Sequence, residues 1–283
     1  MHQRVNGVTK RFSKVGWEIL KYMAFIIFSV YSLTPLTWLV AAAFHPNPTY
    51  LLELPKKPTL KNFAMIFIEG DMSRWLMNSL ILGTFSMMFA VATTVLAGYA
   101  LSRLDFWGKD AFMSVLLIGG FMPWIARMIP TYKICISLGL IDNMVGTALV
   151  IAAGSLPSQT WIIKGFFDAV PRELEEQAWI CGSTRLDTLF RVVFPLVGHG
   201  VAVVAFLSFV GGWGSFAIPL ILLHSEANWP MSLGIALFMG AKEYRMDLGA
   251  LTAAVLIYIV PPLVIYYVIH EHLTKVKLTK MEV

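Results

Sequence analysis

The chain has 283 residues, of which 57% are hydrophobic and 14% are charged, and its mean hydropathy is +0.70. This composition excludes an ordinary soluble domain and indicates a protein that uses the lipid bilayer as its solvent. The formal net charge of +5 does not indicate nucleic-acid binding, because no basic cluster is interleaved with aromatic residues on a soluble segment.

Uncharged runs long enough to cross a bilayer, which takes roughly 20 residues, follow one another along the chain. Five clear runs are residues 22–44, 75–102, 143–163, 192–225 and 248–270. A sixth run, residues 111–126, reaches spanning length if its helix continues through Arg127 towards Pro130. The sequence therefore predicts an all-α, polytopic membrane protein with six transmembrane helices.

The distribution of lysine and arginine predicts the orientation. If the N-terminus is cytoplasmic, 14 of the 22 lysines and arginines lie in cytoplasmic segments and eight lie outside. This asymmetry favours an N-in, C-in topology. The predicted segments are a cytoplasmic N-terminal segment 1–21, a first transmembrane helix 22–44, an extracytoplasmic loop 45–74 with a short helix near 60–68, a core of five transmembrane helices 75–270, and a cytoplasmic tail 271–283. Within the core, residues 164–195 form a cytoplasmic loop.

This loop contains a charged, amphipathic stretch that is unusual in so apolar a chain. Its first half predicts a short helix over residues 171–181. Pro171 suits the first helical turn, and Glu173, Glu175 and Glu176 place negative charge at the positive end of the helix dipole. Gly182 fits a helix stop, where a left-handed backbone costs a glycine least.

The second half of the stretch predicts another amphipathic helix that ends at Pro195. Apolar residues recur at helical spacing on one face, while charged residues lie on the other. The apolar residues are Leu186, Leu189, Phe190, Val193 and Phe194, and the charged ones are Arg185, Asp187 and Arg191. Amphipathicity alone is also typical of a helix pair that rests on lipid headgroups.

The spacing of the stretch resembles the EAA loop of permease subunits in ABC importers, which reads Glu-Ala-Ala, three residues, Gly, nine residues, then Ile-x-Leu-Pro. Here Glu176, Gln177 and Ala178 stand at the first three positions and Gly182 at the glycine. Val192, Phe194 and Pro195 stand at the closing positions. The chain departs from the pattern at Gln177, where a longer amide replaces a small alanine.

Other segments are similar to the carbohydrate branch of these permeases, the maltose-type branch, and extend the resemblance over roughly residues 75–277. They are Ile129-Pro130-x-Tyr132, residues 138–142, Trp161-Ile162-x-Lys164-Gly165-Phe166-Phe167, residues 248–255 followed by Pro261, and Leu273-Thr274-Lys275. The resemblance implies a type I ABC importer permease fold, in which residues 75–270 are the permease core. It also implies a multi-pass protein of the cell membrane that imports a di- or oligosaccharide.

The resemblance implies that the chain is a non-catalytic subunit of a larger complex. The partners would be a second, different permease subunit, two cytoplasmic ABC ATPase subunits and an extracytoplasmic sugar-binding protein. No Gly-x-x-x-x-Gly-Lys-Ser/Thr phosphate loop occurs. We therefore expect no catalytic residue, metal or cofactor in this chain, with ATP and Mg²⁺ bound by the partner ATPase subunits.

The resemblance makes the short helix of the loop a coupling helix that docks into a cleft on the ATPase. Glu176 would make a charged contact, Ala178 would permit close approach, and Gly182 would supply the turn. The full set of predicted coupling residues is Arg172, Glu173, Glu175, Glu176, Gln177, Ala178, Gly182 and Pro195. The tail with Lys275, Lys277 and Lys280 either reaches the ATPase or is solvated.

A second departure from the family lies in the fifth span. Many sugar permeases carry Trp-Asn-Glu-Phe there, whereas this chain has Trp213-Gly214-Ser215-Phe216. The nearby glycines predict a kink or break of the helix. Trp213, Ser215 and Phe216 are candidates for the translocation path, where an aromatic ring would stack on a sugar. Close packing of small residues between helices is the interpretation we favour.

Two other classes of function compete with the importer. An ion-coupled secondary transporter needs ionisable groups near the middle of the bilayer. The centres of the five clear spans contain no Asp, Glu, Lys or Arg, and His199 is the one candidate that they offer for such a group. A membrane scaffold would not need the spacing of the loop. An importer for a non-sugar solute also stays open.

Overall fold

The computed structural model describes residues 2–68, 70–241 and 247–274. Every regular element among these residues is a helix, which confirms the predicted all-α class. The elements are α1 His2–Ala43, α2 Lys61–Ile68, α3 Met72–Arg103, α4 Lys109–Phe121, α5 Trp124–Ser137, α6 Met144–Asp168, α7 Glu173–Ile180, α8 Arg185–Thr188, the π-helix η1 Leu189–Val193, α9 Phe194–Leu196, α10 Gly198–Gly214, α11 Ala217–Leu222, the 3₁₀ helix η2 Glu226–Asn228, α12 Met231–Ala241 and α13 Leu248–Thr274.

The chain divides into two compact units, and the smaller one comprises residues 1–69 and 244–256. In this unit the apolar side chains of α1 from Trp17 onward are largely exposed, as expected of a helix that faces lipid. The predicted short helix near 60–68 is confirmed as α2. Its buried Asn62 donates from Nδ2 to the carbonyl oxygens of Ala43 and His45, each at 2.9 Å, which ties α2 to the end of α1.

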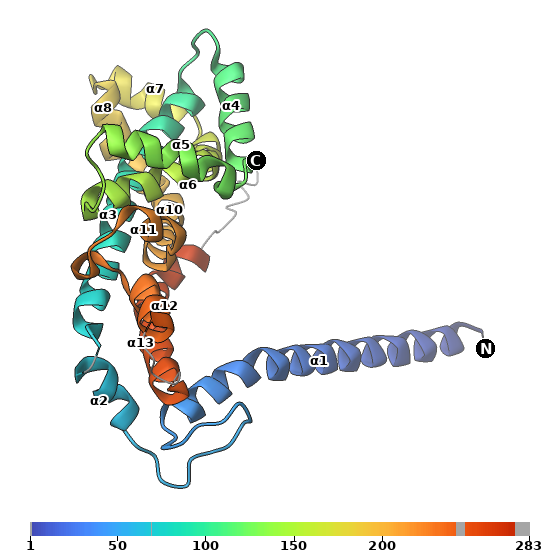
Figure 1. The fold of residues 1–283 in the computed structure, drawn as a ribbon. Coiled ribbons are helices and arrows are strands. Elements are labelled where there is room, and N and C mark those ends of the chain that lie inside the picture. Colours follow the sequence, from blue (N-terminus) through green and yellow to red (C-terminus); the bar gives the residue numbers. More distant parts are fainter. Residues whose placement is uncertain (1, 69, 242–246, 275–283) are drawn as a thin grey trace. The chain divides into compact units, whose positions relative to one another are not determined.

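The larger unit comprises residues 70–243 and 257–283. Its centre is formed by α3, α6 and α10, which pack side by side (Figure 1). Gly212 of α10 allows the closest approach: a Cβ atom there would lie 2.8 Å from both the Cα of Gly83 and the carbonyl oxygen of Leu82 in α3. Small residues therefore bring the helix backbones together, as is common in membrane helix pairs.

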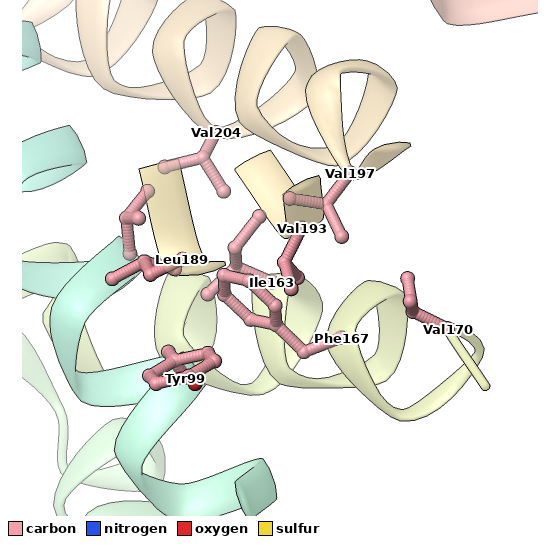
Figure 2. Packing of buried hydrophobic residues seen from close by; sticks show 9 residues of the cluster. Tyr99, Ile163, Phe167, Val170, Leu189, Val193, Val197 and Val204 are labelled. Carbon is pink, nitrogen blue, oxygen red and sulfur yellow. The ribbon is translucent and has the colours of Figure 1, made fainter. Parts of the chain in front are cut away.

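A hydrophobic cluster joins these three helices to the segment that follows α7 (Figure 2). Its members are Val95, Tyr99, Ile163, Phe167, Val170, Leu189, Val193, Val197 and Val204. The ring of Tyr99 meets that of Phe167 edge-on, with centroids 5.6 Å apart. The predicted loop is thus packed onto the ends of the membrane helices through its second half.

Three stretches of the described residues are long and apolar enough to cross a membrane as single helices: Trp17–Ala43, Met72–Arg103 and Leu248–His270. Two further candidates are bent pairs of helices, one over 109–137 and one over 185–214. The predicted span 143–163 corresponds to α6 and its N-cap Asn143; α6 is not among these candidates, and Ser155, Pro157, Ser158 and Gln159 interrupt its hydrophobic run.

The prediction that residues 111–126 continue as one helix through Arg127 is wrong. α4 ends at Phe121, and α5 begins at Trp124 after a bend of 105°. Pro123 is the cause, because a proline disfavours the helical conformation of the residue before it. Met122 accordingly has an extended backbone, with φ −64° and ψ 127°.

The predicted span 192–225 is also broken. The helical segment before Gly198 meets α10 at 81°, and α10 itself ends at Gly214. Ser215 then has an extended backbone, and α11 begins at Ala217. The break that the glycines around Trp213 predicted is therefore confirmed.

Candidate functional site

The first half of the predicted coupling loop forms the short helix α7. The backbone N–H groups of Glu175 and Glu176 donate to the carbonyl oxygen of Arg172 at 3.0 and 3.1 Å, which starts the helix. The predicted short helix is confirmed, but it covers Glu173–Ile180 and not 171–181, so that Pro171 precedes the helix and does not form its first turn. Glu173 and Glu176 lie exposed in the first turn, where the helix dipole favours negative charge.

Gly182 ends α7 as predicted. Its φ is +88°, in the left-handed region. Its N–H donates to the carbonyl oxygen of Trp179 at 2.9 Å, and the N–H of Ser183 donates to that of Ala178 at 3.0 Å. These two bonds form a Schellman motif, which satisfies the last carbonyl groups of the helix and turns the chain back.

A threonine cap starts the second half of the loop. The hydroxyl of Thr184 donates to a carboxylate oxygen of Asp187 at 2.6 Å and accepts from the Asp187 N–H at 3.2 Å. The hydrogen bond from Thr184 lowers the pKa of Asp187 below its ordinary value. Such a reciprocal cap fixes the first turn of α8.

The predicted apolar face of this second half is only partly buried. Leu189 and Val193 point into the hydrophobic cluster, as Figure 2 shows, whereas Leu186 is 65% exposed and Phe190 is 54% exposed. The apolar residues of the predicted face therefore do not share one environment. The π-helix η1 explains the difference, because its wider turn shifts residues away from α-helical spacing.

Glu175 differs from the other two acidic residues of α7, because its side chain points inward. It is 1% exposed and forms an ion pair with Arg103 at the end of α3. Its second oxygen accepts from the hydroxyl of Tyr99 at 3.0 Å. Arg103 also donates to the carbonyl oxygen of Val170 at 2.8 Å. Glu175 therefore presents no free carboxylate at the surface.

A second polar group lies beside this pair and joins the ends of α3 and α6. The hydroxyl of Ser102 donates to Asp168 at 2.5 Å, and Lys164 donates to the other oxygen of Asp168 at 2.6 Å. Arg172 donates to the carbonyl oxygen of Ser102 at 3.2 Å. Partial burial raises the pKa of Asp168, but the hydrogen bonds from Lys164 and Ser102 outweigh it and hold this pKa below its ordinary value.

The outward surface of the loop carries both charge and apolar side chains. Ile180 is 86% exposed, and the guanidinium of Arg185 lies 5.9 Å from the ring centre of Trp179. The predicted coupling residues on this surface are Arg172, Glu173, Glu176, Gln177, Gly182 and Pro195, with Ala178 half-buried beneath them. An exposed apolar patch rimmed by charge is typical of a protein-binding surface.

Sequence reasoning missed Tyr99, Ser102, Arg103 and Asp168 as members of this site. Arg103 entered the prediction only as a charge that fixes topology. It lies 72 positions from Glu175, and no local pattern in the sequence connects the two. A basic residue at the end of an apolar span is the one available signal, and it is equally typical of a membrane interface.

The candidates for the translocation path differ in exposure. Trp213 is 2% exposed; its ring stacks between Phe209 and Tyr258, and its Nε1 donates to the Tyr258 carbonyl oxygen at 3.1 Å. The carbonyl oxygen of Ser215 accepts from Ser232 at 2.7 Å. Phe216 is 40% exposed. The position of Trp213 agrees with the packing interpretation that we favoured from the sequence.

A cavity of about 560 Å³ lies among α5, α6 and α11. Its lining is mainly apolar and includes Trp124, Arg127, Thr131, Gly154 and Ile218. Trp213, Ser215 and Phe216 do not line it.

A second anchored loop lies between α11 and α12. The carboxylate of Asp142 accepts from the backbone N–H groups of His224 and Ser225 at 3.1 and 3.0 Å and from Asn228 at 3.1 Å. The hydroxyl of Ser225 also donates to this carboxylate. Its hydrogen bond has the largest effect among those that lower the pKa of Asp142 to about 2. Asn78 of α3, which is buried, donates to the carbonyl oxygens of Ala227 and Trp229 at 2.8 and 2.9 Å.

Part of the predicted tail, including Lys275, Lys277 and Lys280, lies outside the described residues.

The chain is similar to curated sugar permeases over most of its length. It is 26% identical over 267 residues to the diacetylchitobiose uptake system permease protein NgcG of Streptomyces coelicolor, a match that covers 93% of this chain and 87% of NgcG. It is 26% identical over 257 residues to the maltodextrin transport system permease protein MdxG of Bacillus subtilis, covering 90% of this chain and 92% of MdxG.

The fold is shared with a chain in the crystal structure of a bacterial ABC transporter involved in the import of the acidic polysaccharide alginate. The TM-score is 0.79 at 19% sequence identity, and the match covers 93% of this chain and 98% of the other. A family model, the binding-protein-dependent transport system inner membrane component, matches residues 13–276. This multi-pass membrane protein therefore belongs to the family of inner membrane components of binding-protein-dependent transport systems.

Proposed function

We propose that this chain is a permease subunit of an ABC importer for a di- or oligosaccharide. Its membership of the binding-protein-dependent family supports import, and the names of NgcG and MdxG support a carbohydrate as the solute. The chain is non-catalytic in this proposal. ATP and Mg²⁺ are bound by two partner ATPase subunits in the cytoplasm, and this chain holds no cofactor.

The single observation that carries the mechanism is the two-sided character of α7. One side is held inside the protein through Glu175, while the opposite side exposes Glu173, Glu176 and Gln177. A helix that is fixed on one side and open on the other can receive a partner without changing its own position. We assign the open side, with the exposed Ile180, to the ATPase.

Force would pass from the ATPase to the membrane through the same helix. Closure of the ATPase dimer on ATP moves α7, and the hydrophobic cluster carries that movement to α3, α6 and α10. Packed interfaces of this kind transmit rigid-body motion because they do not deform continuously. The spans then alternate between inward-facing and outward-facing arrangements.

The proposal requires six spans with both termini in the cytoplasm. Five come from the three long apolar helices, from the bent pair over 109–137, and from α10 of the bent pair over 185–214, whose first part belongs to the cytoplasmic loop. The sixth lies in α6, whose 25 residues correspond to about 37 Å of helix, so that it can cross the bilayer core and its last residues can belong to the cytoplasmic loop. In this topology the loop with α7 is cytoplasmic, and the loop held by Asp142 is extracytoplasmic.

The complete importer contains a second permease subunit and a sugar-binding protein in addition to the two ATPase subunits. In this proposal the second permease subunit completes the solute path. The loop between α11 and α12 is a rigid extracytoplasmic element on which the binding protein could dock.

The test is ATP hydrolysis by the purified complex, with binding protein added and sugars supplied one at a time. Stimulation by one sugar is the expected result and names the substrate class. Hydrolysis without stimulation by any sugar would leave an importer for a non-sugar solute. If no ATPase co-purifies with the chain, the proposed coupling role of α7 is wrong. Glu176→Lys, which reverses an exposed charge on α7, should weaken co-purification, whereas Asp105→Asn, at an exposed carboxylate outside this loop, should leave it unchanged.

A further inference from the structure

We propose that Tyr99, Arg103 and Glu175 act as a positioning clamp that locks α7 to the end of α3. The inference rests on the proposed function. In this view the clamp delivers the ATP-driven movement of α7 to α3, so that ATP hydrolysis is converted to transport without slippage. The three residues touch neither solute nor nucleotide and act by holding α7 in one orientation.

The helix α7 needs such an anchor because it is short. Its eight residues are fewer than an isolated helix requires in water. Arg172 at its N-cap makes no side-chain cap hydrogen bond. At its other end, the Schellman turn at Gly182 fixes how the chain leaves the helix through hydrogen bonds within α7 itself, to the carbonyl oxygens of Ala178 and Trp179. The orientation of α7 is therefore determined by the side chains that reach it from other elements.

Glu175 supplies this connection with both of its oxygens. One pairs with the Arg103 guanidinium and the other accepts from the Tyr99 hydroxyl, and both partners are in the last two turns of α3. The side chains of Arg103 and Glu175 are 8% and 1% exposed. Because water does not compete at such burial, the pair favours a single arrangement.

Arg103 in turn fixes the segment that leads into α7. Its planar guanidinium donates in three directions, to Glu175, to the Val170 carbonyl oxygen at 2.8 Å and to the Ser102 hydroxyl at 3.1 Å. A guanidinium with three partners cannot rotate without breaking hydrogen bonds. The clamp therefore joins the end of α3 to the connection after α6 as well as to α7.

A buried ion pair adds little net stability over apolar residues of similar volume. The alternative role, simple stabilisation of the fold, can thus be separated from positioning by an apolar replacement. In Arg103→Met with Glu175→Leu, both charges are removed together, so that no buried charge is left unpaired. This double variant should assemble and yet lack the directed link between α7 and α3.

The experiment measures sugar transported per ATP hydrolysed by the complete complex in proteoliposomes. A purely structural role would lower transport and hydrolysis in proportion to the amount of assembled complex and leave this ratio unchanged. We expect the ratio to fall at least about fivefold in the double variant and about twofold in Tyr99→Phe, which keeps the ring packed against Phe167. Asp105→Asn, which changes a carboxylate that is 87% exposed in the connection between α3 and α4, is the control and should keep the wild-type ratio.

A wild-type ratio in an assembled double variant would overturn the clamp and leave the proposed function intact. If the double variant does not assemble, Tyr99→Phe decides: a lowered ratio supports the clamp, and a wild-type ratio overturns it. Absence of sugar-stimulated hydrolysis in the wild-type complex would instead overturn the proposed function, and the clamp with it.

Discussion

The larger unit holds a loop at each end of its central helices, and the two loops are held by different chemistry. At the end where α3 and α6 finish, the buried pair of Arg103 and Glu175 fixes α7. At the end where α6 begins, the Asp142 carboxylate at the surface accepts hydrogen bonds from two backbone N–H groups, and the buried Asn78 amide donates to two carbonyl oxygens.

This difference in anchoring determines how strongly each loop depends on a single interaction. A buried charge that loses its partner is costly, so the α7 end depends strongly on one pair. The loop between α11 and α12 divides its anchoring among several neutral or exposed hydrogen bonds, each of which contributes less. We expect the α7 end to respond sharply to single substitutions and the other end to respond gradually.

The largest effect should follow Arg103→Met. It leaves the Glu175 carboxylate buried without its cation, and the free energy of unfolding should fall by about 3–5 kcal/mol. Thermal unfolding of the purified chain in detergent measures this. Lys109→Met is the matched control, because the Asp105 carboxylate that pairs with Lys109 is 87% exposed, and the pair should contribute less than about 1 kcal/mol. Equal losses in the two variants would contradict the difference between buried and exposed charge.

At the other end, Asn78→Leu removes both donors from the carbonyl oxygens of Ala227 and Trp229. The expected loss is roughly 1–3 kcal/mol, less than that of Arg103→Met, because the orphaned groups are neutral. Amide exchange of the loop between α11 and α12 should rise. Thr94→Val is the control in the same helix, since the buried Thr94 hydroxyl donates only to Ala90 of its own helix. A greater loss for Asn78→Leu than for Arg103→Met would reverse the comparison.

A smaller effect is expected of Gly182→Val. The open space around this position accepts a side chain, but the φ of +88° costs a β-branched residue about 1–2 kcal/mol. Coupling of hydrolysis to transport should fall, because the turn after α7 is distorted. Gly182→Asn should retain most coupling, since asparagine tolerates the left-handed region. Loss of coupling in both variants would show that side-chain size, and not backbone strain, is decisive.

The smallest effect concerns acid and the Asp142 loop. The pKa of Asp142 is lowered from 3.8 to about 2, so its contribution to stability is fully present above pH 3.8 and is lost as the pH falls towards 2. Protection of the His224 and Ser225 amides, corrected for intrinsic exchange, should decrease over that interval. In Asp142→Asn it should already be low at neutral pH and should not change further. A pH-independent wild-type loop would remove the assigned role of this carboxylate.

Local signals in the sequence predicted local structure well. Gly182 identified the end of α7, and the glycines around Trp213 identified the break after α10, because both depend on the residues immediately around them. The bend at Pro123 was not predicted. The apolar composition of the segment indicated one continuous helix, whereas the effect of the proline on the backbone of Met122 ended α4. The different exposure of Leu186 and Phe190 was not predicted, because a π-helix is not detectable from a 3.6-residue repeat.

By itself, the sequence determined that the chain is a helical membrane protein with a charged loop that begins with an acidic helical turn and a glycine stop. Composition and short-range spacing are sufficient for these features. Only the tertiary structure decided that Glu175 faces inward while Glu173 and Glu176 face outward, and that Arg103 is its partner. The physical reason is that a buried ion pair forms between residues far apart in the chain, where packing selects one carboxylate among three that look alike in sequence.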